Sequence, residues 1–206
     1  MSQDKKLIVD YMPFEITPQQ INESMEKHNG KLVVSGVLQR ADAKNQNGRV
    51  YPKDTLVREA KKYAETFIKE RRALGELDHP DSSVVNLNNV SHNVREMSWK
   101  GDDLVGTVEV LSTPAGNILK ELFKSGIKLG ISSRGLGSVK EIQEDESDSV
   151  EVQPDFELIA FDFVSNPSTH GAFLSPIHEG VQKDKNYVCG KYCKAEAIVS
   201  EIIGGE

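Results

Sequence analysis

The sequence predicts a protein of the α+β class, a mostly antiparallel β domain packed with two or three helices. Several short segments are rich in β-branched and aromatic residues, turn residues separate them, and other segments repeat apolar residues at helical spacing. The 206-residue chain is long enough for one domain of ordinary size. We expect residues 1–176 to form that domain and residues 177–206 to form a C-terminal tail.

The first third of the chain predicts one strand and one helix. Residues 1–30 are mixed and weakly periodic, so no element is predicted there. A β-branched strand is expected over residues 31–40, followed by a turn at Asn45–Gly48. Asp54 then begins a helix whose apolar residues recur at helical spacing as far as Ile68.

The middle of the chain predicts a loop, a hairpin and a second helix. Residues 75–80 are expected as a loop, and residues 90–99 and 104–111 as two strands joined by a tight turn. Thr113 and Pro114 are typical of a helix start, with Gly126 as its end. The expected buried stripe of this helix is Ile118, Leu119, Leu122 and Phe123.

The remaining part of the domain predicts two strands separated by an acidic loop. Residues 128–139 carry a glycine-rich run and are expected as an irregular strand, whereas residues 156–164 are the strongest strand candidate. Residues 141–157 hold eight acidic residues and are predicted to be a solvated loop.

Composition excludes several function classes. The formal net charge of −7 argues against binding to nucleic acid or to an anionic membrane surface. No apolar run approaches the length of a membrane span, and the N-terminus is no secretory signal. Cys189 and Cys193 are expected to be free thiols in a reducing cytoplasm, with a metal site there as the alternative.

Two adjacent serines, Ser132 and Ser133, are the first candidates for chemistry. They lie in the glycine-rich run Gly130–Ser138, where the backbone can present a hydroxyl beside free N–H groups, as acyl transfer requires. The run matches neither the α/β-hydrolase elbow nor a phosphate-binding loop. A purely structural role for both serines remains the alternative.

His79 is the second candidate, in a turn constrained by Pro80. A neutral imidazole within reach of a serine hydroxyl would accept its proton and activate it. The neighbouring carboxylates of Glu76, Asp78 and Asp81 also allow a metal site or a simple acidic turn.

Three further residues complete the candidate set. Asp162 falls on an apolar strand, where a carboxylate is costly unless it is hydrogen-bonded, and it could orient a catalytic imidazole. His170 could fill the same place. Arg134 could support an oxyanion or meet an acidic substrate side chain. No spacing rule makes these residues converge.

The chain resembles the prohead proteases of tailed bacteriophages, of the T-even-like type, through motifs that occur in the family's order with similar spacing. The strings Gly-Glu-Leu-Asp-His-Pro and Ser-Ser-Arg-Gly-Leu-Gly-Ser are individually specific, and the resemblance covers roughly residues 35–176. The motifs are Asn47–Pro52, Ala73–Pro80, Trp99–Gly101, Gly130–Ser138 and Asp162–Ser168.

This resemblance implies a serine endopeptidase with a fold similar to herpesvirus assemblin, a bent antiparallel β-barrel surrounded by helices. Such enzymes act inside the prohead in the host bacterial cytoplasm, cleave scaffold or core proteins and the major capsid protein, and then destroy themselves. Carried over by motif, the nucleophile is Ser132 and the general base is His79, with no metal or other cofactor.

The resemblance leaves the rest of the site less determined. Asp162 matches the third catalytic position, which is a histidine in the herpesvirus enzymes, so Asp162 and His170 both stay open. Backbone N–H groups around Ser133, Arg134 and Gly135 are expected to hold the oxyanion. Ser133 also stays open as the nucleophile.

The family implied by the resemblance cuts after glutamate with an aliphatic residue two places earlier. Ile177-His178-Glu179-Gly180 fits that pattern and predicts self-cleavage after Glu179. Leu119-Lys120-Glu121 fits it too, but inside a predicted helix. The alternative functions are a non-catalytic capsid scaffold or core protein and a metal-dependent hydrolase. The candidate ligands of the hydrolase are Glu76, Asp78, His79 and Asp81, with His92 as a further ligand.

Overall fold

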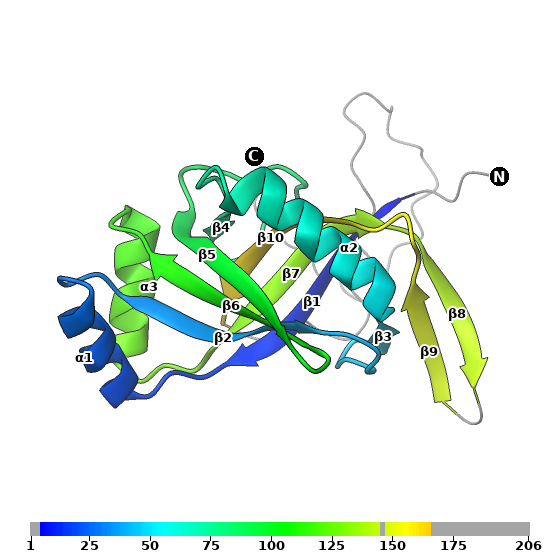
Figure 1. Cartoon of the computed structure of the whole chain (residues 1–206), viewed down its shortest axis with the longest axis horizontal. Helices are drawn as coiled ribbons and strands as arrows, with labels where there is room; N and C mark the ends of the chain where they lie inside the picture. The colour runs from blue at the N-terminus through cyan, green and yellow to red at the C-terminus, as the bar shows by residue number, and fades with distance from the viewer. Residues whose placement is uncertain (1–4, 145–146, 166–206) are drawn as a thin grey trace, which may run out of the picture. The chain divides into compact units, whose positions relative to one another are not determined.

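The computed structural model describes residues 5–144 and 147–165, and all statements about elements refer to these ranges. They contain ten strands, three α-helices and one short π-helix (Figure 1). In chain order these are β1 (Lys6–Phe14), α1 (Pro18–Lys27), β2 (Val33–Arg40), β3 (Arg49–Val50), α2 (Lys53–Tyr63), η1 (Ala64–Ile68), β4 (Leu74–Glu76), β5 (Val90–Lys100), β6 (Asp103–Val110), α3 (Pro114–Lys124), β7 (Leu129–Gly137), β8 (Val139–Glu144), β9 (Ser147–Val152) and β10 (Glu157–Val164).

The predicted α+β class is confirmed, and the described strands form three sheets. Their orders are β1-β7-β10, β2-β6-β5-β4 and β3-β9-β8. Pairing within the sheets is antiparallel except between β3 and β9, and a parallel bridge between Leu77 and Phe163 connects the end of β4 to β10. The strands of the described region do not close into the expected barrel.

The helices predicted from apolar spacing and capping residues are present. The first continues from α2 into η1, so the apolar pattern as far as Ile68 does follow one helical segment. The side chain of Thr113 accepts a hydrogen bond from the N–H of Gly116 and caps α3. One part of the buried stripe was wrong, because Ile118 is 55% exposed whereas Ala115 and Gly116 are buried.

Two predictions about element content were wrong, and the loop expected over residues 75–80 begins only after β4, which covers Leu74–Glu76. Residues 1–30 hold β1 and α1, and α1 begins with a capping box between Thr17 and Gln20. Residues 141–157 are no loop, because β8 and β9 form a hairpin there and Val152 is fully buried. The hairpin was not predicted because its acidic residues resemble a solvated loop. An antiparallel strand with one face in solvent needs few buried side chains, so it can be largely acidic.

The core lies where the β1-β7-β10 sheet meets the β2-β6-β5-β4 sheet. The ring of Phe163 on β10 is the centre of an aromatic group, with ring centroids 5.1 Å from Phe14, 4.7 Å from His92 and 5.3 Å from Phe123. Helices α1 and α3 lie side by side at one end of the sheets, and α2 lies along β10 (Figure 1). The core therefore fixes β7 and β10, the strands that carry Ser132 and Asp162.

Several predictions fall outside the described residues. These are the domain boundary between 176 and 177, the cleavage site at Glu179, the alternative third residue His170, and the thiols of Cys189 and Cys193. Within residues 5–144 and 147–165, no helix combines the length and the apolar character that crossing a membrane requires.

Candidate active site

Ser132 lies in the central strand of its sheet, with a neighbour on each side. It pairs with Tyr11 on β1 and with Asp162 on β10. Residues directly opposite in an antiparallel pair share a face, so these three side chains lie on the same face of the sheet. Ser132 is 1% exposed, and its Oγ is buried without a hydrogen-bond partner.

Ser133 points to the opposite face of β7, because side chains alternate along a strand. Its Oγ accepts a hydrogen bond of 2.8 Å from Nε2 of Gln39 and donates one of 3.5 Å to the carbonyl of Asp10. The two adjacent serines are therefore in different environments: the hydroxyl of Ser133 is bonded within the protein, and that of Ser132 is not.

A buried ionic network lies beside Ser133. The carboxylate of Asp10 accepts hydrogen bonds of 2.6 Å from both Arg49 and Asn47, and a further one from the hydroxyl of Tyr51. Burial and the nearby Asp10 carboxylate raise the pKa of Tyr51 well above its ordinary value, so the phenol stays a donor. This network was not predicted from the sequence, although Asp10 interrupts an apolar strand and Arg49 and Tyr51 belong to a family motif.

His79 lies in a turn that pairs with the outer edge of β10. The N–H of Asp78 donates a 2.8 Å hydrogen bond to the carbonyl of Phe163, and Asp78 has a φ of 64°. His79 follows directly, and its Nδ1 is buried without a partner. Strand β10 therefore lies between this turn and β7, the strand that carries Ser132.

Asp162 does not contact the imidazole in the way that the sequence predicts. Its Oδ2 accepts a 2.8 Å hydrogen bond from Nε of Arg134, and its Oδ1 accepts hydrogen bonds from Nη2 of Arg134 at 3.2 Å and from the N–H of Glu76 at 2.9 Å. Burial raises the pKa of Asp162, while the charge of Arg134 opposes the shift. These hydrogen bonds of the carboxylate thus come from Arg134 and Glu76.

Arg134 is also placed differently from the prediction, because it is fully buried rather than directed at a substrate. Besides Asp162, its guanidinium binds Oε1 of Glu76 at 3.1 Å and the carbonyl of Ser82 at 2.7 Å. The side chain connects the strand of Ser132 to the segment that carries His79.

The expected oxyanion donors lie in a strand that is paired on both edges. Ser133 is opposite Asp10 and Phe161, and Gly135 is opposite Ile8 and Leu158. A Cβ on Gly135 would come within 2.4 Å of the Phe156 ring, so this glycine permits close packing. The role of the N–H groups of Ser133, Arg134 and Gly135 stays a prediction.

The side chains of the alternative metal site do not assemble. No group of three or more His, Cys, Asp or Glu side chains in the described ranges is arranged to hold a metal ion. His92 is fully buried, with Nε2 2.9 Å from the carbonyl of Phe161 and Nδ1 2.8 Å from the hydroxyl of Ser91. Oε1 of Glu76 is bonded to Nη2 of Arg134 and to the N–H of Asn86.

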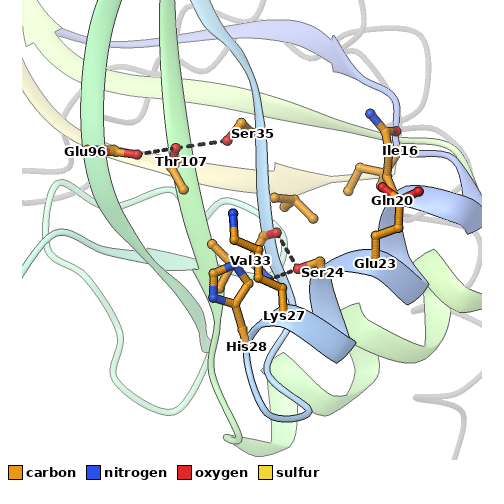
Figure 2. Close-up of a pocket in the computed structure, with 11 residues that line it drawn as sticks. Ile16, Gln20, Glu23, Ser24, Lys27, His28, Val33, Ser35, Glu96 and Thr107 are labelled. Atoms are coloured by element: carbon orange, nitrogen blue, oxygen red, sulfur yellow. Dashed lines mark hydrogen bonds between the residues drawn. The ribbon is translucent and has the colours of Figure 1, made fainter.

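Two pockets lie outside this constellation. One, of about 440 Å³, lies between α1 and the β2-β6-β5 face (Figure 2); the bonds of Ser24 to Val33 and of Ser35 to Thr107 are in its wall. None of its lining residues is a predicted catalytic residue. A second pocket of about 200 Å³ borders Tyr11, the neighbour of Ser132, and is also lined by Gln39, Arg40 and Lys44.

Comparisons with known proteins establish the family. The family model described as "Prohead core protein serine protease" matches residues 4–182. The chain belongs to this family of prohead core proteases. It is 32% identical to the prohead core protein protease of Enterobacteria phage T4 over 162 residues, which is 74% of this chain and 75% of the relative.

A solved structure agrees with this assignment. The bacteriophage T4 capsid assembly protease matches with a TM-score of 0.70 and 27% identity, over 80% of this chain and all of the T4 chain. The resemblance inferred from the motifs is confirmed, and the protein is a phage prohead maturation protease. The relationship to herpesvirus assemblin is not tested by these matches.

Proposed function

We propose that this prohead protease is a serine endopeptidase in which Ser132 is the nucleophile and His79 is the general base. The observation that carries the proposal is the state of two atoms, Oγ of Ser132 and Nδ1 of His79. Both are buried and neither bonds to another group of the described residues, so both are available for a proton transfer or for a substrate. The two residues lie in the two specific family motifs.

The reaction follows from these roles. His79 accepts the proton of the Ser132 hydroxyl while Oγ attacks the scissile carbonyl carbon, and the imidazolium then gives that proton to the leaving amine. Water, deprotonated by the same imidazole, hydrolyses the resulting ester and regenerates the serine. Catalytic hydrogen bonds are often long in the free enzyme and shorten when substrate binds, which suits the unpaired state of both atoms.

Asp162 enters the proposal as the carboxylate opposite Ser132, not as a hydrogen-bond partner of His79. Its charge is paired with Arg134, so we assign it no direct contact with the imidazolium, and His170 remains the alternative at this position. The oxyanion is assigned to N–H groups of Ser133, Arg134 and Gly135. The bent-barrel kinship with assemblin belongs to the same proposal.

The proposed substrates are the core or scaffold proteins and the major capsid protein of the prohead, together with the enzyme itself. The proposed site of action is the prohead interior in the host cytoplasm. Self-cleavage is expected after Glu179. The competing pattern ending at Glu121 lies within α3, where Leu119 is fully buried, so cleavage there would require unfolding of the helix.

Intact-mass analysis of the purified chain over time tests the proposal. The wild type is expected to lose the segment after Glu179, Ser132→Ala and His79→Ala are expected to stay intact, and Glu179→Gln tests the site. Mixing a trace of wild type with tagged Ser132→Ala distinguishes cleavage between molecules. Trimming by Ser132→Ala alone would overturn the assignment of the nucleophile.

The alternative functions make opposite predictions with inhibitors. The serine mechanism predicts labelling of Ser132 by a fluorophosphonate and full activity in a chelator. A metal-dependent hydrolase predicts the reverse, and a non-catalytic scaffold or core protein predicts neither labelling nor turnover.

A further inference from the structure

The guanidinium of Arg134 bonds to two parts of the segment that carries His79. Arg134 lies two residues after Ser132, on the same face of β7. Its Nη2 donates to Oε1 of Glu76 at 3.1 Å and its Nη1 donates to the carbonyl of Ser82 at 2.7 Å. One side chain of the nucleophile strand thus reaches the histidine segment both before and after His79.

These attachments are arranged evenly around the histidine. Glu76 lies three residues before His79, and Ser82 lies three residues after it. The same Oε1 of Glu76 also accepts the N–H of Asn86 at 2.9 Å, which ties the far end of the loop to its beginning. The loop is held at its start, its middle and its end by one buried ionic group.

Asp162 holds the other side of the guanidinium. It accepts from Nε and Nη2 of Arg134 and, through Oδ1, from the N–H of Glu76. Arg134, Glu76 and Asp162 are all 0% exposed, so their bonds are not weakened by competing water. The group connects β7, β10 and the end of β4.

We infer that Arg134 is a positioning residue for the proposed reaction: with Glu76 and Asp162, it sets the place of the His79 turn relative to Ser132. This inference rests on the proposed serine mechanism. The sequence predicted that Arg134 contacts the substrate or the oxyanion, whereas the structure shows Arg134 bonded to the segment that carries the general base.

Only an arginine satisfies this geometry. Its planar fork offers separate N–H groups to Asp162, Glu76 and the Ser82 carbonyl at fixed angles, whereas a lysine presents one nitrogen on a flexible stem. The turn also contains a positive φ of 64° at Asp78, which is uncommon for a residue with a side chain. A displacement of about 1 Å between nucleophile and base is enough to cost about 100-fold in rate.

The test compares Arg134→Lys and Glu76→Gln with Arg49→Lys in the full chain. Arg49 is a matched control, since it is an equally buried arginine that binds a carboxylate, Asp10, on the other face of the sheet. Two readouts are used below the unfolding temperature of each variant. One is the rate at which a fluorophosphonate labels Ser132, and the other is the set of ring NMR resonances of His79.

The inference predicts that Arg134→Lys and Glu76→Gln are labelled by the fluorophosphonate about 100-fold more slowly than the wild type while remaining folded. Their His79 ring signals are expected to broaden or to split into several positions. Arg49→Lys is expected to unfold at a lower temperature but to keep the labelling rate and the single His79 environment. A folded Arg134→Lys with wild-type labelling and an unchanged His79 ring would overturn the inference.

Two further outcomes are informative. If the wild type itself is not labelled at Ser132, the proposed mechanism fails, and the His79 resonances alone decide whether the ionic group holds the turn. If Arg134→Lys does not fold, the test uses two other measurements. These are the labelling rate of Glu76→Gln and the hydrogen-exchange rate of the Asn86 backbone amide in the wild type. Exchange at Asn86 as fast as in an unstructured peptide would overturn the inference.

Discussion

Ser132 and Ser133 lie on opposite faces of β7, and of the two hydroxyls only that of Ser133 has hydrogen-bond partners. Nε2 of Gln39 donates to Ser133 Oγ at 2.8 Å, whereas Ser132 Oγ is buried and unpaired. Substituting each serine separately therefore distinguishes a structural role, expected for Ser133, from a catalytic role, expected for Ser132.

Ser132→Ala is expected to abolish peptide cleavage without lowering the free energy of unfolding, because the hydroxyl makes no bond in the folded enzyme. Ser133→Ala removes the acceptor of Gln39 Nε2 and is expected to cost about 1–3 kcal/mol, with cleavage retained. Urea unfolding and substrate cleavage measured on both variants check this. The reverse pattern, with activity lost only in Ser133→Ala, would move the nucleophile to Ser133.

The ionic network of Asp10 is expected to dominate the stability of the β1 edge. Asp10→Asn leaves the buried Arg49 without its carboxylate and is expected to lower the free energy of unfolding by about 3–5 kcal/mol. Tyr51→Phe removes one hydrogen bond to the same carboxylate and is expected to cost about 2 kcal/mol. Urea unfolding measures both.

A surface ion pair provides the control for this network. Asp102 binds Lys53 at 2.8 Å, and both side chains are largely exposed. Asp102→Asn is therefore expected to leave the urea midpoint unchanged. An Asp10→Asn variant as stable as Asp102→Asn would show that the buried network contributes little.

His92 is expected to make the fold sensitive to acid. Burial lowers its pKa from 6.5 to about 4, so the unfolded chain takes up a proton at a pH where the folded protein does not. Its contribution is therefore complete above pH 6.5 and is lost as the pH falls toward 4, by about 3 kcal/mol in total.

The substitution His92→Gln tests this pH dependence. A glutamine can keep the N–H donor to the carbonyl of Phe161 but cannot titrate, so the stability curve of the variant is expected to be flatter between pH 6.5 and 4. Thermal unfolding across this range measures the difference. Parallel curves for wild type and variant would assign the acid sensitivity to other groups.

Gly75 and Gly130 are expected to respond differently to alanine. A Cβ at Gly75 would lie 2.0 Å from the backbone oxygen of Phe161 and 2.2 Å from the His92 ring, so Gly75→Ala is expected to prevent folding. A Cβ at Gly130 would instead meet the ring of Tyr11 at 1.5 Å, and that side chain can rotate. Gly130→Ala is expected to fold with reduced stability.

A second substitution checks the cause of the Gly130 effect. Tyr11→Ala removes the ring that the new Cβ would meet, so it is expected to recover part of the stability that Gly130→Ala loses. Thermal unfolding of the two single variants and the double variant measures this coupling. Additive losses would show that the ring is not the obstacle.

The sequence predicted the elements whose signals are local. The apolar spacing of α2, the Thr113 cap of α3 and the tight turn between β5 and β6 act within a few residues, so they can be recognised without the fold. Strand β1 was missed because its partners lie elsewhere in the chain: it pairs with β7, and Asp10 is bonded to Arg49 and Tyr51. The β8–β9 hairpin is local, but its many acidic residues resemble a solvated loop, and only the fold shows that Val152 is buried.

The motifs alone determined the family and the two residues, Ser132 and His79, on which the proposed chemistry depends. Short strings of unusual residues can be recognised in a sequence without knowing which residues contact one another. Tertiary structure decided what each neighbour does. It directed Ser132 and Ser133 to opposite faces, bonded Asp162 to Arg134 instead of His79, and joined Arg134 to the His79 loop. These relationships depend on strand register and on the burial of charge, which bring residues 58 and 86 positions apart into hydrogen-bond contact and leave no trace in sequence spacing.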